Sequence, residues 1–518
     1  MPVRSNPMLF SLCLSAVLAT ASCGGGSPDS HVEDKPGTET PSDLPLLAGD
    51  LPAESSAIAS ASCSALPALP ARPAHVRSVA EFGVQPNDSV DHTDAIQRAL
   101  NSLAPGEWLV FPPGRYTHSK SLHMKVANTV MWGDGATLHA TNPSDQAIWI
   151  EADGASVYKF TMTAVTNTRR TTPWESRIAV FGGTNPPRLL TGNVVRGNKV
   201  LWGGDPGTPL QNSASSAGIF IYHATGFLVA ENTVSRTLAD GIHVTSGSSY
   251  GRIINNYVKE TGDDMIAVVS YIGDPSTSAA DVAANFAARR ARDMNHHITI
   301  SGNMVSGQYW GRGISVVGGE NVTIENNSID RTTHAAAVYL ARETSYLTFG
   351  VRNVLVRNNS ITDVQTTIPA YTAGTVSPNA PKTGHGAVEI YSFVFSDEAA
   401  NSMLSSALSV QNILVESNTI NRARNDGVRV GTGWGRTSSF TGKRSDGSSY
   451  TRSYTGGVVG LIGLTSNKMS AIGGQAIAIN NRPTAQNNIS CSGNTDDGGG
   501  ASNGLCSGGV PVVAPACP

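Results

Sequence analysis

Charged residues are scarce in this chain of 518 residues. Lys, Arg, Asp and Glu together make up 14% of it, aromatic residues 6%, and the formal net charge is -3. A nucleic-acid-binding protein carries a basic face, so this charge balance argues against a nucleic-acid partner. Neither a zinc-like cysteine spacing nor a Ser-His-Asp or phosphate-loop pattern stands out. The 54 glycines suit a β-structure with tight turns better than a helical protein.

The apolar run near the N-terminus, from Leu9 to Leu18, is too short to span a bilayer permanently. It follows Arg4 and precedes Cys23, which is the arrangement of a bacterial export signal with a lipoprotein-type cleavage site. Thr20 stands where such signals usually have Leu, and an ordinary secretory signal is the alternative. We predict an export signal over 1–23, with Cys23 carrying an outer-membrane lipid anchor, and a periplasmic or cell-surface location. Residues 24–74, rich in Ser, Pro and Ala, are predicted to be a flexible linker.

Cysteine is also rare, with six residues. Four of them lie outside the export signal: Cys63, Cys491, Cys506 and Cys517. Four cysteines in an exported chain suggest two disulfides, which can pair in three ways. We expect Cys491–Cys506 and Cys63–Cys517, which would make 491–518 a disulfide-linked C-terminal tail.

What the chain does contain is a repeat. One half of each unit is a glycine followed by alternating aliphatic residues, as in Gly241-Ile-His-Val and Gly313-Ile-Ser-Val. The other half is a short strand closed by an asparagine and another aliphatic residue, as in Asn232-Thr-Val, and the steps from Asn232 to Asn256 and from Asn303 to Asn327 are 24 residues. A short fixed period with occasional insertions is typical of a solenoid, and strands alternating at period two exclude a helical repeat. We predict an all-β, right-handed parallel β-helix over 75–490.

Stacking of the coils at ~4.8 Å would align equivalent residues in columns. The aliphatic positions would form the core, and the asparagines a ladder of amide hydrogen bonds with a structural role. Residues 93–103 show the pattern of a short amphipathic helix that would cap the open end of the first coil. A second short helix is expected over 281–292, where its Arg289-Arg-Ala-Arg292 cluster could face an anionic glycan.

The opening of the folded part resembles a known family. The run Phe82-Gly-Val, His92-Thr-Asp-Ala-Ile and Val110-Phe-Pro-Pro-Gly-Arg-Tyr116 is similar to the N-terminal cap and first coil of the pectate-lyase-like superfamily, which includes rhamnogalacturonase/epimerase-like proteins and tailspike depolymerases. The resemblance implies a parallel β-helix that cleaves or modifies a polysaccharide. It does not specify the sugar.

Two outward columns carry the candidate site residues. The position before each glycine-led strand gives Asp240, Asp264, Arg312 and His385, and the middle of each strand gives His243, Tyr339, Glu389 and Arg429. Clustered carboxylates raise one another's pKa, which is how a pair divides into acid and base. The predicted catalytic residues are Asp240, Asp263, Asp264 and Arg312. The predicted substrate-binding residues are His243, Lys259, Tyr271, Trp310, Tyr339, Arg342, His385, Glu389 and Arg429.

A second resemblance concerns these carboxylates. Leu238-Ala-Asp240, Gly262-Asp-Asp264 and Gly311-Arg312-Gly313 are similar to the Asn-Thr-Asp, Gly-Asp-Asp and Gly-His-Gly motifs of polygalacturonase-type hydrolases. The resemblance implies that the three aspartates act as acid and base in an inverting hydrolysis that needs no cofactor. Arg312 stands where that family has His, and Tyr339-Leu-Ala occupies roughly the place of its Arg-Ile-Lys motif.

Two alternatives remain open at this stage. A polysaccharide lyase acting on a uronic acid would use Arg312 as base, with His243 or Lys259 assisting and Ca²⁺ bound by Asp240, Asp263 and Asp264. A non-catalytic glycan-binding surface protein would instead use aromatic platforms, for which the candidates are Tyr222, Tyr271, Tyr309, Trp310 and Trp434. Hydrolysis of an acidic polysaccharide is the leading hypothesis, and the sequence does not indicate an oligomeric state.

Overall fold

The structure is a computed structural model, and it describes residues 66–165, 169–170, 172–183, 187–201, 214–308, 310–367, 382–432, 438–444, 447–480 and 489–497. The export signal with Cys23, most of the linker, Cys63, Cys506, Cys517, Tyr309 and Trp434 lie outside these residues. The lipid anchor, the location and the disulfide pairing therefore stay predictions. Helices among the described residues are all too short or too polar to cross a membrane.

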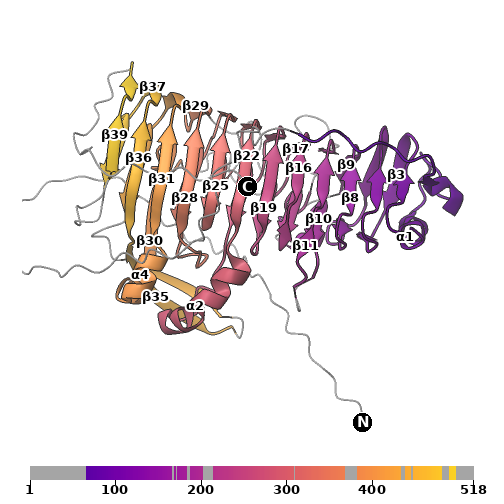
Figure 1. Ribbon diagram of the computed structural model, residues 1–518, viewed down its shortest axis with the longest axis horizontal. Coiled ribbons are helices and arrows are strands. Elements are labelled where there is room, and N and C mark those ends of the chain that lie inside the picture. The colour runs from indigo at the N-terminus through magenta and orange to yellow at the C-terminus, as the bar shows by residue number, and fades with distance from the viewer. Residues whose placement is uncertain are drawn as a thin grey trace, which may run out of the picture.

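Each coil contributes one strand to each of three sheets, which run along the length of the molecule (Figure 1). We call them sheets A, B and C, in the order in which the chain visits them. Neighbouring strands within each sheet are parallel, apart from the hairpin β34–β35 that joins sheet C. This is the predicted right-handed parallel β-helix.

Sheet A contains β1 (Arg77–Ser78), β2 (Trp108–Val110), β5 (Val130–Trp132), β8 (Ser156–Tyr158), β11 (Leu190–Thr191), β12 (Val194–Arg196), β15 (Ala224–Thr225), β16 (Leu228–Ala230), β19 (Ser249–Ile254), β22 (His296–Ser301), β25 (Gly319–Glu325), β28 (Val351–Arg357), β31 (Val410–Glu416), β36 (Val459–Thr465) and β39 (Ile489–Ser492). Sheet B contains β3 (Gly114–His118), β6 (Ala136–Ala140), β9 (Thr161–Ala164), β13 (Lys199–Val200), β17 (Thr233–Ser235), β20 (Tyr257–Lys259), β23 (Met304–Ser306), β26 (Ser328–Asp330), β29 (Ser360–Val364), β32 (Thr419–Ala423), β37 (Lys468–Ile472) and β40 (Thr495–Asp496). Sheet C contains β4 (Leu122–Met124), β7 (Ile148–Ile150), β10 (Ile178–Phe181), β14 (Ile219–Tyr222), β18 (Ile242–Thr245), β21 (Ile266–Val269), β24 (Ile314–Val317), β27 (Val338–Arg342), β30 (Val388–Phe395), β33 (Val428–Thr432), β38 (Ile477–Asn480), β34 (Ser438–Lys443) and β35 (Ser449–Gly456).

The core follows the predicted columns. Ile242, Ile266 and Ile314 stand opposite one another in β18, β21 and β24, and all three are fully buried. The asparagines form the expected ladder, in which each side-chain amide donates to the side-chain oxygen of the next asparagine. The ladder extends beyond the asparagines that the sequence pattern indicated, from Asn198 to Asn494. Register along the coil is thus fixed by buried hydrogen bonds as well as by apolar packing.

Strand pairing confirms one outward column and corrects the other. Phe220, His243, Ala267, Ser315, Tyr339, Glu389 and Arg429 are paired in that order across sheet C, as predicted. In the column before the strands, the prediction for His385 was wrong by one residue. Val388 pairs with Val428, so Gly386 stands opposite Asp426. Gly386 therefore occupies the column of Asp240 and Asp264, whereas His385 lies one residue earlier, with its ring centroid 5.3 Å from that of Tyr339.

The helices close one end of the coil and cover one flank. Helix α1 (Thr93–Asn101) packs at the N-terminal end, as predicted for a cap, with Ile96, Ala99 and Leu100 buried (Figure 1). Helices α2 (Ala279–Asp293), α3 (Ser396–Ala399) and α4 (Ser402–Ala407) lie with the β34–β35 hairpin beside the later coils (Figure 1). The 3-10 helices are η1 (Val79–Phe82) and η2 (Pro173–Glu175).

The helices and the hairpin on this flank form a second apolar cluster. The arginines of α2 form ion pairs with neighbouring carboxylates. The cluster contains Ile272, Val282, Leu347, Phe349, Phe395, Leu404 and Leu408. On α2, Arg289 donates to the carbonyl of Ile272 and pairs with Asp281, whereas Arg290 pairs with Glu320. The basic cluster of α2 is therefore engaged with the protein's own carboxylates, which leaves the expectation that it faces an anionic glycan without support.

Candidate active site

The candidate site lies on the outer face of sheet C, where the turns before β18, β21 and β24 meet. The register of these strands places Asp240, Asp264 and Arg312 at equivalent positions on three successive coils. Asp264 is almost completely buried. Its Oδ1 accepts a hydrogen bond from the backbone N–H of Arg312 at 2.6 Å, and its Oδ2 accepts one from Ser315 Oγ at 2.5 Å. A backbone N–H and a serine hydroxyl of the next coil therefore orient this carboxyl group.

Gly311 brings Asp263 and Asp264 together. Its φ of 78° lies in the left-handed region that favours glycine. A Cβ at this position would stand 2.3 Å from Asp263 Oδ1 and 2.4 Å from Asp264 Oδ1. Both carboxylates therefore approach the same point, and the chain can pass there only because residue 311 has no side chain.

Two arginines hold the carboxylates in place. Arg169 reaches Asp263 from the excursion after β9, 94 residues earlier in the sequence. Arg312 pairs with Glu343, and its Nη1 lies 3.8 Å from Asp264 Oδ2. The guanidinium of Arg312 also lies over the ring of Tyr339, 4.3 Å from its centroid. Burial of this cation is thus compensated by two carboxylates and an aromatic face.

Tyr271 and Tyr346 stand at the edge of the same charged group. Burial raises the pKa of Tyr271 well above its ordinary value, and the negative charge of Asp240 adds to this effect. Burial likewise raises the pKa of Tyr346, with Asp263 and Glu343 as contributing charges. Both phenols therefore remain protonated hydrogen-bond donors at neutral pH.

The surroundings of Asp264 favour the protonated form of its carboxyl group. Burial raises the pKa of its carboxyl group to about 8, against the opposing attraction of Arg312, and the negative charges of Asp263 and Asp240 raise it further. Three carboxyl groups so close together cannot all ionise easily. The most deeply buried of them is therefore the one that stays protonated at neutral pH.

On the far side of the group, Asp240 is bound to a histidine. His243 Nδ1 lies 2.6 Å from Asp240 Oδ2, and its ring stacks on Phe220 with centroids 5.0 Å apart. Further rings continue this row along the outer face of sheet C, with centroid distances between neighbours of 4.9 to 6.5 Å: Tyr222, Phe181, Trp149, Trp174 and His123. Trp174 is the most exposed of these, at 36%. The sequence pattern indicated Tyr222 as an aromatic platform of the binding alternative, but it did not predict the row as a whole.

The predicted substrate-binding residues fall into three groups. We call Asp240, Asp263, Asp264, Arg312 and Glu343 together the acidic cluster. Tyr271 and Tyr339 lie next to this cluster. Trp310 is exposed and stacks on His334 with centroids 4.2 Å apart, and burial lowers the pKa of His334 to about 4. Further along sheet C, Arg429 Nε donates to both carboxylate oxygens of Glu389, at 3.0 and 2.8 Å.

The residues of this further group are mostly buried. Burial raises the pKa of Glu389 to about 7, against the opposing attraction of Arg429. Burial lowers the pKa of His385 to about 3, and the nearby charge of Arg312 contributes. His385 is therefore neutral at neutral pH, and it binds the hydroxyl of Thr383 at 2.6 Å.

Two placements differ from the expectation. Arg342 is fully buried and pairs with the equally buried Glu398 at 2.6 Å, because the excursion with α3 covers it. Its substrate-binding role is therefore corrected to a structural one. Lys259 lies on β20 in sheet B, with Nζ 5.6 Å from the centroid of the Tyr257 ring. The coil turns a corner between β20 and β21, which separates Lys259 from the acidic cluster.

The aspartates do not form a ready calcium site. Asp263 is paired with Arg169, Asp240 with His243, and both oxygens of Asp264 accept hydrogen bonds. In the part of the chain that the structure describes, no group of three or more His, Cys, Asp or Glu side chains is arranged to hold a metal ion. Each of the three carboxyl groups that the lyase alternative would give to Ca²⁺ thus has at least one oxygen bound within the protein, and calcium binding stays a prediction.

We expect Gly311→Ala to lower activity by about 100-fold, because a displacement of about 1 Å at a reacting group can cost that much. The new Cβ would collide with both carboxylates and with the backbone N of Asp264, 2.6 Å away. Gly106→Ala is the matched control, since Gly106 has a φ of 89° but nothing within 4 Å of its Cβ position. Initial rates measured for the two variants should differ widely, and equal rates would contradict this geometry.

Comparison with known proteins agrees with the fold. The family described as "Rhamnogalacturonase A/epimerase, pectate lyase-like" matches residues 76–376. Among solved structures, the Agl-KA catalytic domain is similar with a TM-score of 0.55 and 17% identity, covering 83% of this chain and 67% of that one. The A-module of the mannuronan C-5 epimerase AlgE6 from Azotobacter vinelandii has a TM-score of 0.50 and 15% identity, covering 81% and 99%. The catalytic domain of a GH87 alpha-1,3-glucanase in complex with nigerose has a TM-score of 0.50 and 17% identity, covering 83% and 70%. No curated protein matches.

Proposed function

The chain belongs to the rhamnogalacturonase A/epimerase, pectate lyase-like family, and from this premise we propose that it is a glycoside hydrolase that cleaves a polysaccharide. Its fold is that of carbohydrate-active enzymes. The observation that carries the proposal is the grouping of Asp264 with Asp263 and Asp240 on the outer face of sheet C, where burial and the two neighbouring charges raise the pKa of Asp264 to about 8. Glycosidic hydrolysis needs one carboxylic acid and one carboxylate.

Each carboxyl group has a distinct role in this scheme. The Asp263–Asp264 pair is the acid: the proton of Asp264 passes to the neighbouring carboxyl group of Asp263, which is the more exposed of the two, and from there to the leaving oxygen, while the attacking water loses a proton to the base. Asp240 is the base that activates water, and its bond to His243 orients it. Arg169 and Arg312 hold Asp263 and Asp264 in position as charge develops.

Elimination is the weaker candidate because its base would be Arg312. The charges of Glu343 and Asp264 raise the pKa of Arg312 well above its ordinary value, although burial alone would lower it. A guanidinium held charged in this way does not accept a proton at neutral pH. Hydrolysis uses the same residues without requiring arginine to lose a proton.

The aromatic row extends from the acidic cluster along sheet C and suits a sugar chain, whose apolar ring faces stack on aromatic side chains. The cations of the site are paired: Arg169 with Asp263, Arg312 with Glu343, and Arg429 with Glu389. These paired cations therefore give no specific support to an acidic substrate, and neutral polymers belong among the substrates tested.

Incubation of the full chain with neutral and uronic-acid polysaccharides, with and without EDTA, should produce reducing ends with at least one polymer. No cleavage of any polymer would overturn the proposal.

The pH profile should report the proton on Asp264. Because its pKa is raised to about 8, the acid form is present below that pH and is lost above it. We expect kcat/KM to fall by about tenfold per pH unit above the pKa. Ser315→Ala removes a hydrogen bond that lowers the pKa of Asp264, so its alkaline limb should move to higher pH. A profile that is flat from pH 7 to pH 10, or one that Ser315→Ala leaves unshifted, would contradict this assignment.

A further inference from the structure

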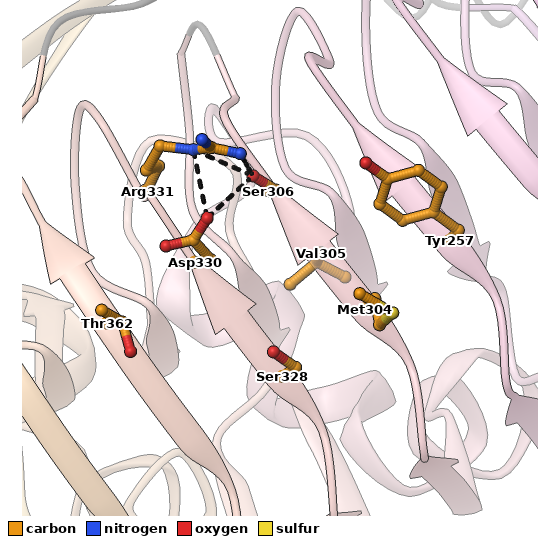
Figure 2. A pocket seen from close by; sticks show the side chains of 8 residues that line it. All are labelled: Tyr257, Met304, Val305, Ser306, Ser328, Asp330, Arg331 and Thr362. Carbon is orange, nitrogen blue, oxygen red and sulfur yellow. Dashed lines mark hydrogen bonds and ion pairs between the residues drawn. The ribbon is translucent and has the colours of Figure 1, made fainter.

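A hollow of about 290 Å³ lies on the outer face of sheet B (Figure 2). The acidic cluster lies on sheet C instead. It is lined by Tyr257, Met304, Val305, Ser306, Ser328, Asp330, Arg331 and Thr362. These residues come from β20, β23, β26 and β29 and from the turn after β26. The hollow therefore crosses four coils.

Side-chain size explains why the sheet is hollowed here. Tyr257, Met304 and Ser328 occupy one outward column, and Ser306 and Asp330 belong to the next. In the first column, Tyr257 and Met304 have large side chains and Ser328 on the next coil has a small one. The change in size leaves space above the serine. The inward neighbours Val258, Val305 and Ile329 belong to the core, so the floor is rigid.

The walls combine an apolar side with a polar one. Tyr257 is 37% exposed and Met304 57% exposed. Opposite them, Arg331 Nε lies 3.1 Å from Asp330 Oδ2, and its Nη2 donates to Ser306 Oγ at 2.7 Å (Figure 2). An exposed ring beside a carboxylate, a guanidinium and hydroxyl groups presents what a sugar needs, a stacking surface and paired donors and acceptors.

We propose that this hollow is a second, non-catalytic carbohydrate site that binds a neutral hexose unit of a polysaccharide chain. Neutral sugar is favoured because Asp330 and Arg331, the two charged residues of the lining, compensate each other's charge. Lys259, with Nζ 5.6 Å from the centroid of the Tyr257 ring, is not part of the lining. The Tyr257 ring stacks on one sugar face, and Asp330, Arg331 and Ser306 bind hydroxyl groups. The inference rests on the proposed function only in taking the ligand to be a polysaccharide. A site separate from the acidic cluster holds the polymer while cleavage proceeds on sheet C.

Native electrophoresis of the full chain in gels that contain dextran, pullulan, laminarin or polygalacturonate tests the proposal. The Asp264→Asn variant serves as the parent so that cleavage does not destroy the polymer. We expect at least one neutral polymer to retard it. Tyr257→Ala should weaken the apparent affinity at least about threefold, as expected for loss of one stacking contact.

Two further variants make the result specific. Tyr250→Ala is the matched control, because Tyr250 is 51% exposed on β19 in sheet A, outside the hollow, and it should bind as the parent does. Ser328→Ile fills the hollow without touching the Tyr257 ring and should weaken retardation as Tyr257→Ala does. Retardation by polygalacturonate alone, no retardation by any neutral polymer, or equal affinity in Tyr257→Ala and its parent would each overturn the inference. The proposed function is judged separately, from reducing ends released by the unmodified chain.

Discussion

Asp264→Asn is expected to lower turnover by about 1,000-fold, in the range that general acid–base groups supply, while the β-helix stays folded. Asparagine has the size of a protonated aspartic acid, and it can still accept a hydrogen bond from the backbone N–H of Arg312. It cannot supply a proton to the leaving oxygen. Initial rates at pH 7 measure the loss, and far-ultraviolet circular dichroism with thermal unfolding measures the fold.

Asp426→Asn is the matched control for this variant. Asp426 occupies the same column before β33, where its Oδ1 accepts a hydrogen bond from the backbone N–H of Gln475 at 2.8 Å. It lies outside the acidic cluster, so its loss should leave turnover close to that of the unmodified chain. If Asp264→Asn retained the activity of Asp426→Asn, the carboxylate mechanism would be wrong.

Arg342→Met is expected to lower the free energy of unfolding by about 3–5 kcal/mol, because removal of one partner leaves the other charge buried and uncompensated. Arg342 and Glu398 are both fully buried. Their pairing is incomplete, since Nε of Arg342 and Oε1 of Glu398 have no hydrogen-bond partner among the described residues. Denaturant unfolding followed by circular dichroism measures the change.

Two comparisons isolate the buried charge as the cause. Replacing both residues, Arg342→Met with Glu398→Leu, should recover much of the loss, because apolar replacements of a buried pair are often neutral or stabilising. Arg188→Met removes the exposed partner of Asp153 and should change stability little. If the double variant were as unstable as the single one, the loss in the free energy of unfolding would come from packing and not from the buried charge.

The coil could be predicted from the sequence because its signals repeat. Each aliphatic pair and each asparagine recurs on the next coil, so one correct assignment fixes the others. That is why the column from Phe220 to Arg429 was confirmed residue by residue. His385 was misplaced because an excursion, part of it outside the described residues, hides where the next coil begins.

The candidate site was predicted only where it lies on the coil. Asp240, Asp264 and Arg312 stand in register and were found from the repeat. Arg169 and Glu343 reach the same place from excursions whose paths no period encodes. Arg342 was misassigned for the opposite reason, since an outward position on the strand is covered by α3. Lys259 is near Asp263 in sequence, but the corner between sheets separates them.

Cleavage in water enriched in heavy oxygen, followed by mass spectrometry of the products, tests the central claim most directly. Hydrolysis by the Asp263–Asp264 acid and the Asp240 base predicts one heavy oxygen at each new reducing end and no unsaturated ends. Unlabelled products with unsaturated uronic ends would mean elimination, and the assignment of the aspartates as acid and base would be wrong.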